Sequence, residues 1–476
     1  MTDPDTIIYP TIDLFSYDLA EGLGQSEDES NQNRNKFWRR INVGQMTADQ
    51  LADVIKIESE LSDYIELLGK DCKEFDYPLN GFYYPVKLND TYALQVHCAI
   101  DLTHKDRDDP SLKYAPRHIP SFQKIQENIV NNLHGSQTNQ PDNHIGQTWF
   151  VWGQLAFADQ KASDAAKRIY GHLKIFDNSS WEKDLKTEIN PSAPKLLGAE
   201  CFELWQLPSD RGDLSQNKHL LICIFPHELN ILDISQTLSK LYPSLMRLFL
   251  YRHKIIWSYH LSRQHKSELK NQVQKIQTAI ALLANQDHSS QIDLAQLQQS
   301  LKSNLNLMNT YVQELIYLES QKNTIATNLE NYQNKLRRLE NHEEDIDIPF
   351  LEKFATIVTK KYIPQIIADI TNLSPNQKFL ENSIRNIEGI ISLEQTRSER
   401  SLNQSIFAVG TGLGTSQITV NILTAQFPVN AIATKSNTLF LIYMVAAFLG
   451  SIVIGGLSGG GVWWWLHRRS RNSKNP

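Results

Sequence analysis

Apolar residues recur with two different spacings along this chain, and the change of spacing divides the chain into two regions. Over Tyr92–Ile100, every second residue is apolar and the residues between are small or polar, which predicts a β-strand with one buried face. Further strands are predicted at Thr148–Phe157, Ala199–Leu207 and His219–Phe225, and helices at Thr47–Leu68, Ser121–Leu133 and Gln160–Lys174. Strands with interspersed helices predict an α/β or α+β domain over residues 37–232.

Residues 233–404 follow a helical period and predict a long helical hairpin and stalk. One helix is predicted over Ile234–Ala284, and seven heptads follow a polar break at Asn285–Gln291. Twelve of their fourteen a and d positions are apolar, which predicts a coiled coil. The a positions are Leu294, Leu301, Met308, Leu315, Lys322, Leu329 and Leu336, and the d positions are Leu297, Asn304, Tyr311, Leu318, Ile325, Tyr332 and Leu339.

The polar break between these helices allows two arrangements. A short break favours an antiparallel hairpin, and a parallel dimer of one continuous rod is the alternative. A second break at Asn341–Pro349 precedes a further helix from Phe350, which the sequence interrupts near Leu373–Pro375. This helix then leads directly into an apolar segment.

Two apolar segments occupy residues 405–466 and predict a C-terminal transmembrane hairpin. The loop between them, residues 428–437, is short, and the second segment is about 29 residues long. At ~1.5 Å per residue it reaches ~43 Å, enough to cross a ~30 Å hydrocarbon core with tilt. Its aromatic end precedes a basic tail, residues 467–476. By the positive-inside rule, both termini are expected in the cytoplasm, and the protein in the inner or plasma membrane.

The first apolar segment carries a stripe of small and polar residues. The stripe consists of Gly410, Gly414, Gln417, Asn421 and Thr424. Polar groups facing lipid would be unpaired, so the stripe is expected to face water or protein. One interpretation is a pore-lining helix, a second is a close helix–helix interface, and a third is that the segment does not span.

The second apolar segment contains two overlapping G-x-x-x-G pairs. They are Gly455 with Gly459 and Gly456 with Gly460. Small residues at this spacing allow two helix backbones to approach closely, so these glycines are predicted to pack against the first helix.

Composition adds little to this organisation. The first 33 residues contain eight acidic residues and no Lys or Arg, so residues 1–36 are predicted to be an acidic disordered segment, with a short ordered stretch at Ile7–Phe15 as the alternative for that part. The net charge is −6, and no basic excess indicates a nucleic-acid partner. The four cysteines (Cys72, Cys98, Cys201 and Cys223) form no C-x-x-C motif and are interpreted as reduced packing residues.

No catalytic motif is present, and the protein is not expected to be an enzyme. Neither Walker A nor H-E-x-x-H occurs in the sequence. An acidic cluster of Glu343, Glu344, Asp345 and Asp347 offers hard oxygen ligands for Mg²⁺ or another divalent cation. A solvated helix turn is the alternative interpretation of this cluster.

The arrangement of a cytoplasmic α/β domain, a long helical hairpin, a stalk helix and a two-helix membrane hairpin resembles the CorA family of divalent-cation channels. The resemblance covers about residues 40–474 in organisation. The Gly-Met-Asn signature of that family is absent, because the corresponding segment reads Thr424–Asn430 without such a triplet. The resemblance implies a homopentamer whose first membrane helices surround the axis.

Two functional hypotheses follow. The first is a CorA-like membrane channel or transporter for cations, gated by its cytoplasmic funnel. The second is a non-transporting, membrane-anchored coiled-coil scaffold or signalling protein that oligomerises and recruits partners through the α/β domain. Both expect a lipid bilayer and further copies of the chain as partners.

Overall fold

A computed structural model describes most of the chain before residue 398. The described residues are 3–22, 24–41, 48–60, 62–70, 72–75, 80–99, 115–133, 143–176, 180–187, 194–208, 214, 217–284, 294–342 and 346–397. They divide into two compact units, one of residues 1–277 with 307–378, the other of residues 278–306 with the chain from 379 onward.

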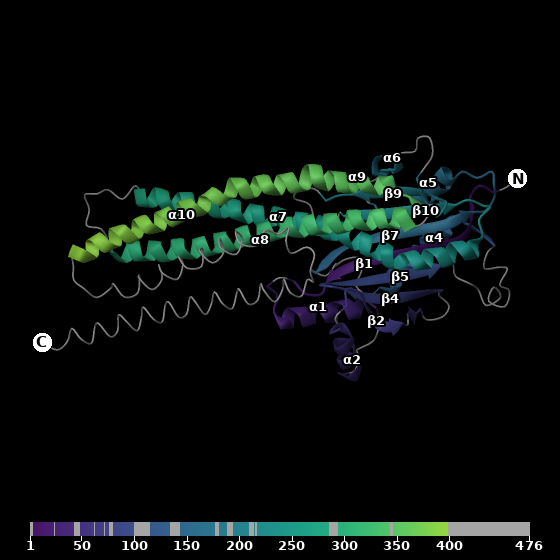
Figure 1. Cartoon of the computed structure of the whole chain (residues 1–476), viewed down its shortest axis with the longest axis horizontal. Coiled ribbons are helices and arrows are strands. Elements are labelled where there is room, and N and C mark those ends of the chain that lie inside the picture. The colour runs from purple at the N-terminus through teal and green to yellow at the C-terminus, as the bar shows by residue number, and fades with distance from the viewer. Residues whose placement is uncertain are drawn as a thin grey trace. The chain divides into compact units, whose positions relative to one another are not determined.

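The first unit contains a mixed sheet of eleven strands (Figure 1). The strands are β1 (Thr6–Leu19), β2 (Ile65–Lys70), β3 (Lys73–Glu74), β4 (Gly81–Leu88), β5 (Thr91–Ala99), β6 (Pro116–His118), β7 (His144–Leu155), β8 (Lys195–Leu196), β9 (Ala199–Gln206), β10 (Lys218–Phe225) and β11 (Ile346–Asp347). Their order is β11-β8-β9-β10-β7-β1-β5-β4-β2, with β3 paired to β4 and β6 to β1. The pair β7 and β10 is parallel, whereas β1 is antiparallel to both β5 and β7.

The helices of the chain are of two kinds, short ones beside the sheet and long ones that follow it. The short helices are α1 (Glu27–Arg40), α2 (Ala48–Glu58), α4 (Ser121–Asn132), α5 (Ala162–His172) and α6 (Trp181–Asp184). The later helices are α7 (Ile231–Ala284), α8 (Leu294–His342), α9 (Pro349–Ile357), the π-helical turn η3 (Val358–Tyr362) and α10 (Ile363–Arg397).

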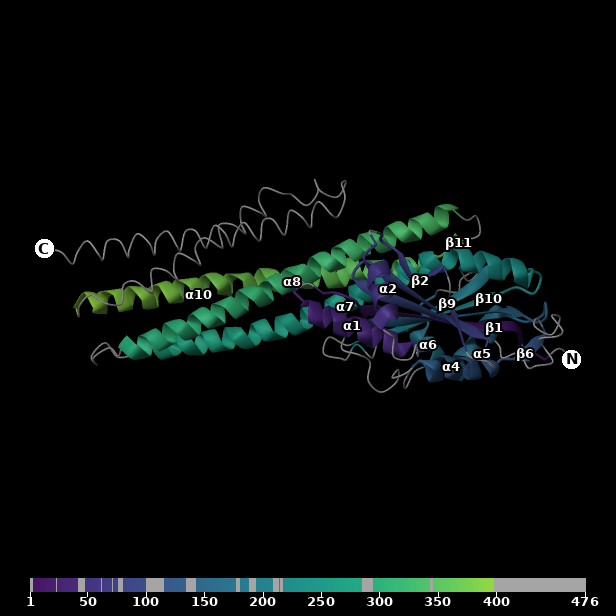
Figure 2. The same cartoon turned by 90° about the horizontal axis from the view of Figure 1, so that it is seen from below.

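The sheet separates two layers of helices, as Figures 1 and 2 show. Because strand side chains alternate between faces, each strand contributes to both layers. On β10, Leu220, Ile222 and Ile224 belong to the apolar core that contains the buried side of α4 and α5. The opposite face of the sheet packs against the first half of α7, where the ring of Phe15 lies 5.5 Å from that of Phe249.

The helix α8 contacts α7 on one side and runs antiparallel to α9 and α10 on the other. His265 on α7 contacts Glu314 on α8 at 2.7 Å. On the other side of α8, Tyr311 donates to the carbonyl of Leu373 and Tyr332 to that of Leu351, so positions rise along α8 while they fall along α9 and α10. The predicted d positions face this interior, because both tyrosines are buried.

The prediction that residues 1–36 are a disordered acidic segment is wrong. Residues 6–19 form β1, a central strand of the sheet, and residues 27–40 form α1. Alternating apolar residues place Ile12 and Leu14 in the core, while the acidic Asp13 and Asp18 are buried with polar partners. Two of the eight acidic residues are thus buried hydrogen-bonding groups, and the segment that contains them is an ordered strand and helix.

The predicted helix at Thr47–Leu68 is also shorter than expected. The helix α2 ends at Glu58, and residues 65–70 form β2 instead. The positions of the apolar residues Ile65 and Leu67 are compatible with either a helix or a strand. Pairing with β4 makes this segment a strand.

The predicted fold class, which included a two-helix transmembrane hairpin, is corrected here. None of the helices within the described ranges is long and apolar enough to cross a membrane. The structure supports a large mixed-sheet domain with long helices, and the membrane location inferred from the hairpin is withdrawn with it. Residues 405–466, on which the hairpin was predicted, lie outside the described residues.

Candidate functional site

A chain of buried hydrogen bonds crosses the face of the sheet that packs against α7. Thr148 Oγ1 on β7 lies 2.8 Å from His219 Nδ1 on β10 and 2.8 Å from His253 Nε2 on α7. His219 Nε2 lies 3.1 Å from Glu203 Oε1 on β9, and Asn217 Nδ2 lies 3.1 Å from His253 Nδ1. All five side chains are buried, so this chain joins three strands to one helix without solvent.

Donor and acceptor counting gives this chain one direction. The Asn217 amide donates to Nδ1 of His253, so the proton of that imidazole resides on Nε2 and is donated to Thr148. The single hydroxyl proton of Thr148 is then donated to Nδ1 of His219, whose Nε2–H reaches the carboxyl group of Glu203. Both histidines are neutral in this arrangement.

The electrostatics agree with neutral histidines. Burial, together with nearby Arg252, lowers the pKa of His219 well below the usual range. Burial, followed by His219 and Arg252, does the same to the pKa of His253. Burial raises the pKa of Glu203 to about 7, although Arg252 acts to lower it. The contact between Glu203 and His219 is therefore a hydrogen bond to a neutral imidazole and not an ion pair.

Arg252 is a buried cation beside this chain of hydrogen bonds. Its guanidinium carbon lies 4.3 Å from the ring centroid of Phe354 and 5.5 Å from that of Trp205. Its three guanidinium nitrogens have no hydrogen-bond partner within the described residues. Burial lowers its pKa, and the nearby Glu203 opposes this shift. Contacts with aromatic faces thus replace the hydrogen bonds that water would give.

A glycine allows α7 to approach the sheet at this point. A Cβ atom on Gly146 of β7 would lie 2.5 Å from Nδ1 of His253 and 2.8 Å from its Cγ. Since no real Cβ contact is that short, only glycine lets the imidazole of His253 lie against the strand. The position of His253 therefore depends on the backbone of β7 as well as on Thr148.

Strand β1 adds a second set of buried polar contacts to α7. Asp13 accepts hydrogen bonds from Tyr242 on α7 at 2.8 Å, from Gln95 at 2.8 Å and from the indole of Trp152 at 3.3 Å. Its other contact is His97 Nδ1 at 2.9 Å. Further along the strand, the Tyr17 hydroxyl donates to the carbonyl of Met246 on α7 at 2.8 Å. The strand predicted to be disordered is thus a main anchor of α7.

Asp18, near the end of β1, connects the sheet to α1. Its carboxylate accepts from Arg40 at 2.5 Å and contacts His144 Nδ1 at 2.8 Å. Burial acts to raise the pKa of Asp18, but Arg40 and His144 outweigh burial and lower it. Asp18 is therefore an ionised, paired carboxylate inside the domain.

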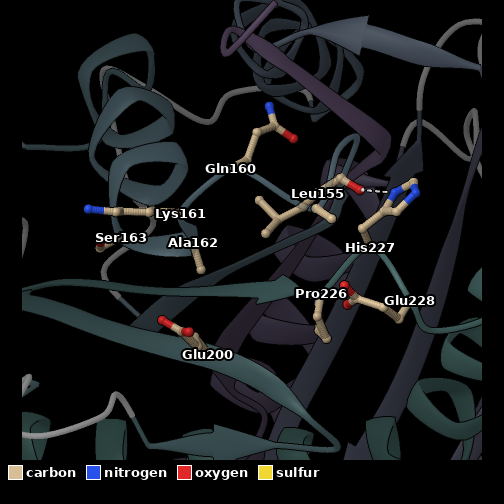
Figure 3. A pocket seen from close by; sticks show the side chains of 10 residues that line it. Leu155, Gln160, Lys161, Ala162, Ser163, Glu200, Pro226, His227 and Glu228 are labelled. Atoms are coloured by element: carbon tan, nitrogen blue, oxygen red, sulfur yellow. Dashed lines mark hydrogen bonds between the residues drawn. The ribbon is translucent and has the colours of Figure 1, made fainter. Parts of the chain in front are cut away.

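A surface cavity of about 370 Å³ lies where the parallel strands β7 and β10 end (Figure 3). Its lining residues come from the segment between the end of β7 and the first turn of α5, from β9 and from the β10–α7 connection: Leu155, Ala158, Gln160, Lys161, Ala162, Ser163, Glu200, Pro226, His227 and Glu228. In open α/β sheets, ligands bind at the carboxyl ends of parallel strands. Figure 3 shows His227 beside the Leu155 carbonyl, at 3.2 Å, while the Lys161 side chain extends away from the other labelled residues.

The wall of this cavity leads directly into α7. His227 and Glu228 lie between the end of β10 and the start of α7 at Ile231. The buried amide of Gln154 on β7 donates to the carbonyls of Pro226, His227 and Leu229, at 3.1, 3.1 and 2.5 Å. One side chain therefore fixes the connection by which β10 becomes α7.

The residues predicted as sites from the sequence lie mostly outside the described residues. This holds for the pore candidates Gly410, Gly414, Gln417, Asn421 and Thr424, for the packing glycines Gly455, Gly456, Gly459 and Gly460, and for Glu343, Glu344 and Asp345. Asp347 belongs to the short strand β11 and pairs with Lys195 on β8. Within the described residues, no group of three or more His, Cys, Asp and Glu side chains could hold a metal ion.

The buried chain of hydrogen bonds was not predicted from the sequence, because no sequence motif contains its residues. Its members are separated by up to 105 positions, the distance from Thr148 to His253. The available signal was a polar residue within an apolar strand, such as His219 in His219–Phe225. Such a residue must find a buried partner, although the strand alone does not identify it.

Comparisons with known proteins gave no match. The chain matches no family model, no curated protein and no solved structure. The CorA-like resemblance, the homo-oligomer and the absence of enzymatic activity therefore stay predictions.

Proposed function

We propose that this protein is a non-enzymatic, ligand-responsive module in which a small polar ligand at the carboxyl ends of β7 and β10 controls the packing of α7. The observation that carries this proposal is that residues 226–228 form one wall of the cavity and lead into α7 three residues later. A ligand that contacts this wall acts on the first turn of a 54-residue helix.

The charges around the cavity favour a zwitterion such as a free amino acid. Glu200 and Glu228 supply two carboxylates for an ammonium group, while the imidazole of His227 supplies a hydrogen-bonding group for a carboxylate. Simple divalent cations are disfavoured because the described residues contain no metal-ligating cluster.

The non-enzymatic part of the proposal rests on burial. The hydrogen-bonded titratable side chains Glu203, His219 and His253 are fully buried between the sheet and α7. A substrate would have to displace the helix to reach these groups. Their arrangement suits a polar connection between sheet and helix better than acid–base chemistry.

The test is thermal unfolding of the full chain with each of the common amino acids at millimolar concentration. At least one is expected to raise the melting temperature, because a ligand that binds only the folded state stabilises it. Glu200→Gln is expected to abolish this rise, while Glu182→Gln, an exposed glutamate on α6, keeps it.

Hydrogen exchange then asks whether the ligand acts on α7. Bound ligand is expected to slow amide exchange over residues 228–234. No stabilisation by any amino acid, or an equal rise in the Glu200→Gln variant, would rule out this ligand site. Binding without any change at residues 228–234 would rule out the coupling to α7.

Self-association through the long helices is a second candidate, and exposed aliphatic residues favour it. Ile316 on α8 is 49% exposed and Ile367 on α10 is 48% exposed, although both helices bury a separate apolar seam. Native mass spectrometry of the full chain gives the subunit count. An oligomer that Ile316→Glu and Ile367→Glu dissociate would support this surface, and a monomeric wild-type chain would exclude it.

Cation transport, which the resemblance to the CorA family implies, required the membrane hairpin and is not part of this proposal.

A further inference from the structure

Two buried cysteines face each other across neighbouring strands. Cys201 on β9 and Cys223 on β10 are register partners in an antiparallel pair. Their sulfur atoms lie 2.9 Å apart, and both side chains are fully buried as free thiols. Directly opposed residues of antiparallel strands have Cα atoms ~4.5–5.5 Å apart, which lies within the range that a disulfide spans.

We propose that Cys201 and Cys223 are a modification site, which becomes a cross-strand disulfide when the chain folds in the presence of a disulfide oxidant such as oxidised glutathione. One cysteine thiolate attacks the glutathione disulfide and releases one reduced glutathione. The second thiolate then attacks the mixed disulfide, forms the Cys201–Cys223 bond and releases the second glutathione. Two thiol protons and two electrons leave the protein, and one glutathione disulfide becomes two thiols.

The bond forms before α7 covers the sheet. In the folded chain both sulfurs are inaccessible, and burial raises the pKa of Cys223 well above its usual range. Thiolates are the attacking species, so exchange is slow once folding is complete. The same burial protects a disulfide, once formed, from reductants.

The disulfide fixes the register of the strands that carry the buried polar chain. Glu203 lies two residues after Cys201 on β9, and His219 lies four residues before Cys223 on β10. A slip of one residue would turn the side chains of one strand to the other face and separate Glu203 from His219. A covalent bond between the strands excludes such a slip.

The remaining cysteines cannot compete for these partners in the folded chain. Cys98 lies on β5, and β1 and β7 separate β5 from β10 in the sheet. At ~4.8 Å per strand the separation is ~14 Å, beyond the reach of a disulfide. Cys72 lies exposed just before β3.

The test is refolding of the denatured full chain with either oxidised or reduced glutathione, followed by mass spectrometry. Oxidative refolding is expected to give a product that has lost two hydrogens, with one cross-linked pair of peptides containing Cys201 and Cys223. The melting temperature is expected to rise by about 5–10 °C over the reduced chain. Cys72→Ser is expected to behave identically, because it leaves the pair intact.

Other outcomes overturn the proposal. Four free thiols after oxidative refolding, or linkage of Cys201 or Cys223 to glutathione or Cys72, would contradict it. A disulfide that lowers the melting temperature would also contradict it, because the strands would then have to distort to form the bond. In the Cys201→Ala variant, oxidative refolding is expected to give no cross-linked peptide that contains Cys223. Peptide masses show this result whatever the stability of the variant.

Discussion

The imidazole Nε2 of His253 lies 2.8 Å from the hydroxyl oxygen of Thr148, and this contact joins α7 to the centre of the sheet. Apolar burial has no direction, so it holds α7 against the sheet without fixing its rotation. Because the hydrogen bond is buried, an arrangement of α7 that leaves either group unpaired costs free energy. The polar chain therefore determines which face and which register of α7 the sheet accepts.

Replacing Thr148 with valine tests these buried hydrogen bonds directly. Valine keeps the shape but leaves His219 Nδ1 and His253 Nε2 without their shared partner. The free energy of unfolding in urea is expected to fall by about 2–4 kcal/mol. Thr371→Val, an exposed position on α10, is the control and is expected to change it by less than about 0.5 kcal/mol. Equal effects in both variants would show that the hydrogen bonds of Thr148 contribute nothing to the free energy of unfolding.

Gly146→Ala tests the close approach of His253. The added Cβ would meet the imidazole at 2.5 Å, so either the strand or α7 must move, at a cost of about 1–3 kcal/mol. Gly171→Ala provides a control of opposite sign, because no atom lies within 4 Å of its Cβ and alanine favours helix by about 1 kcal/mol. Urea unfolding of both variants decides, and a stable Gly146→Ala chain would argue against the contact.

Glu203→Gln is expected to change the pH dependence of stability. The folded pKa of Glu203 is about 7, above its ordinary 4.5, so its contribution is most favourable below pH 4.5 and is lost as the pH rises towards 7. Glutamine stays neutral, so the variant should gain about 3 kcal/mol relative to wild type between about pH 5 and about pH 8.

The two buried histidines titrate in the opposite direction, because their folded pKa values are lowered. The difference between variant and wild type is therefore the quantity to measure, by urea unfolding at both pH values. A difference that does not change with pH would mean that Glu203 is ionised throughout.

Arg252→Met is expected to leave stability unchanged or to raise it by about 1–4 kcal/mol. The guanidinium is buried without hydrogen-bond partners in the described part of the chain, and methionine fills similar volume beside Phe354 without a desolvated charge. Arg252→Ala leaves a cavity and is expected to destabilise. If methionine destabilises as much as alanine, the charge itself stabilises the fold.

Leu318→Ala tests whether the buried apolar side of α8, which contains Leu318 and Tyr332, packs within one copy of the protein. Leu318 is fully buried and its removal is expected to cost about 2–5 kcal/mol, whereas Ile316→Ala, 49% exposed, should cost much less. Since the seam packs against helices of the same chain, the loss should not depend on protein concentration. A concentration-dependent loss would place the seam at an interface between chains.

Several elements were predictable because their signal is local. Alternation identified β5, β7, β9 and β10 within a few residues, and the heptads identified α8, whose d positions such as Leu318 and Tyr332 are buried. The same reasoning misjudged β1, since Asp13 and Asp18 in an acidic segment suggested solvation. Their partners lie on β5, β7, α1 and α7, and a local pattern contains none of them.

The sequence by itself determined the period of each element, because backbone geometry repeats every two or 3.6 residues and selects which positions are apolar. Only the tertiary structure decided the partners of the buried polar groups. Thr148, His219 and His253 come together from distant positions, and a hydrogen bond depends on the distance and direction between two atoms, which no period along the chain records. The cavity at the ends of β7 and β10 was decided in the same way, since its walls come from three separate segments.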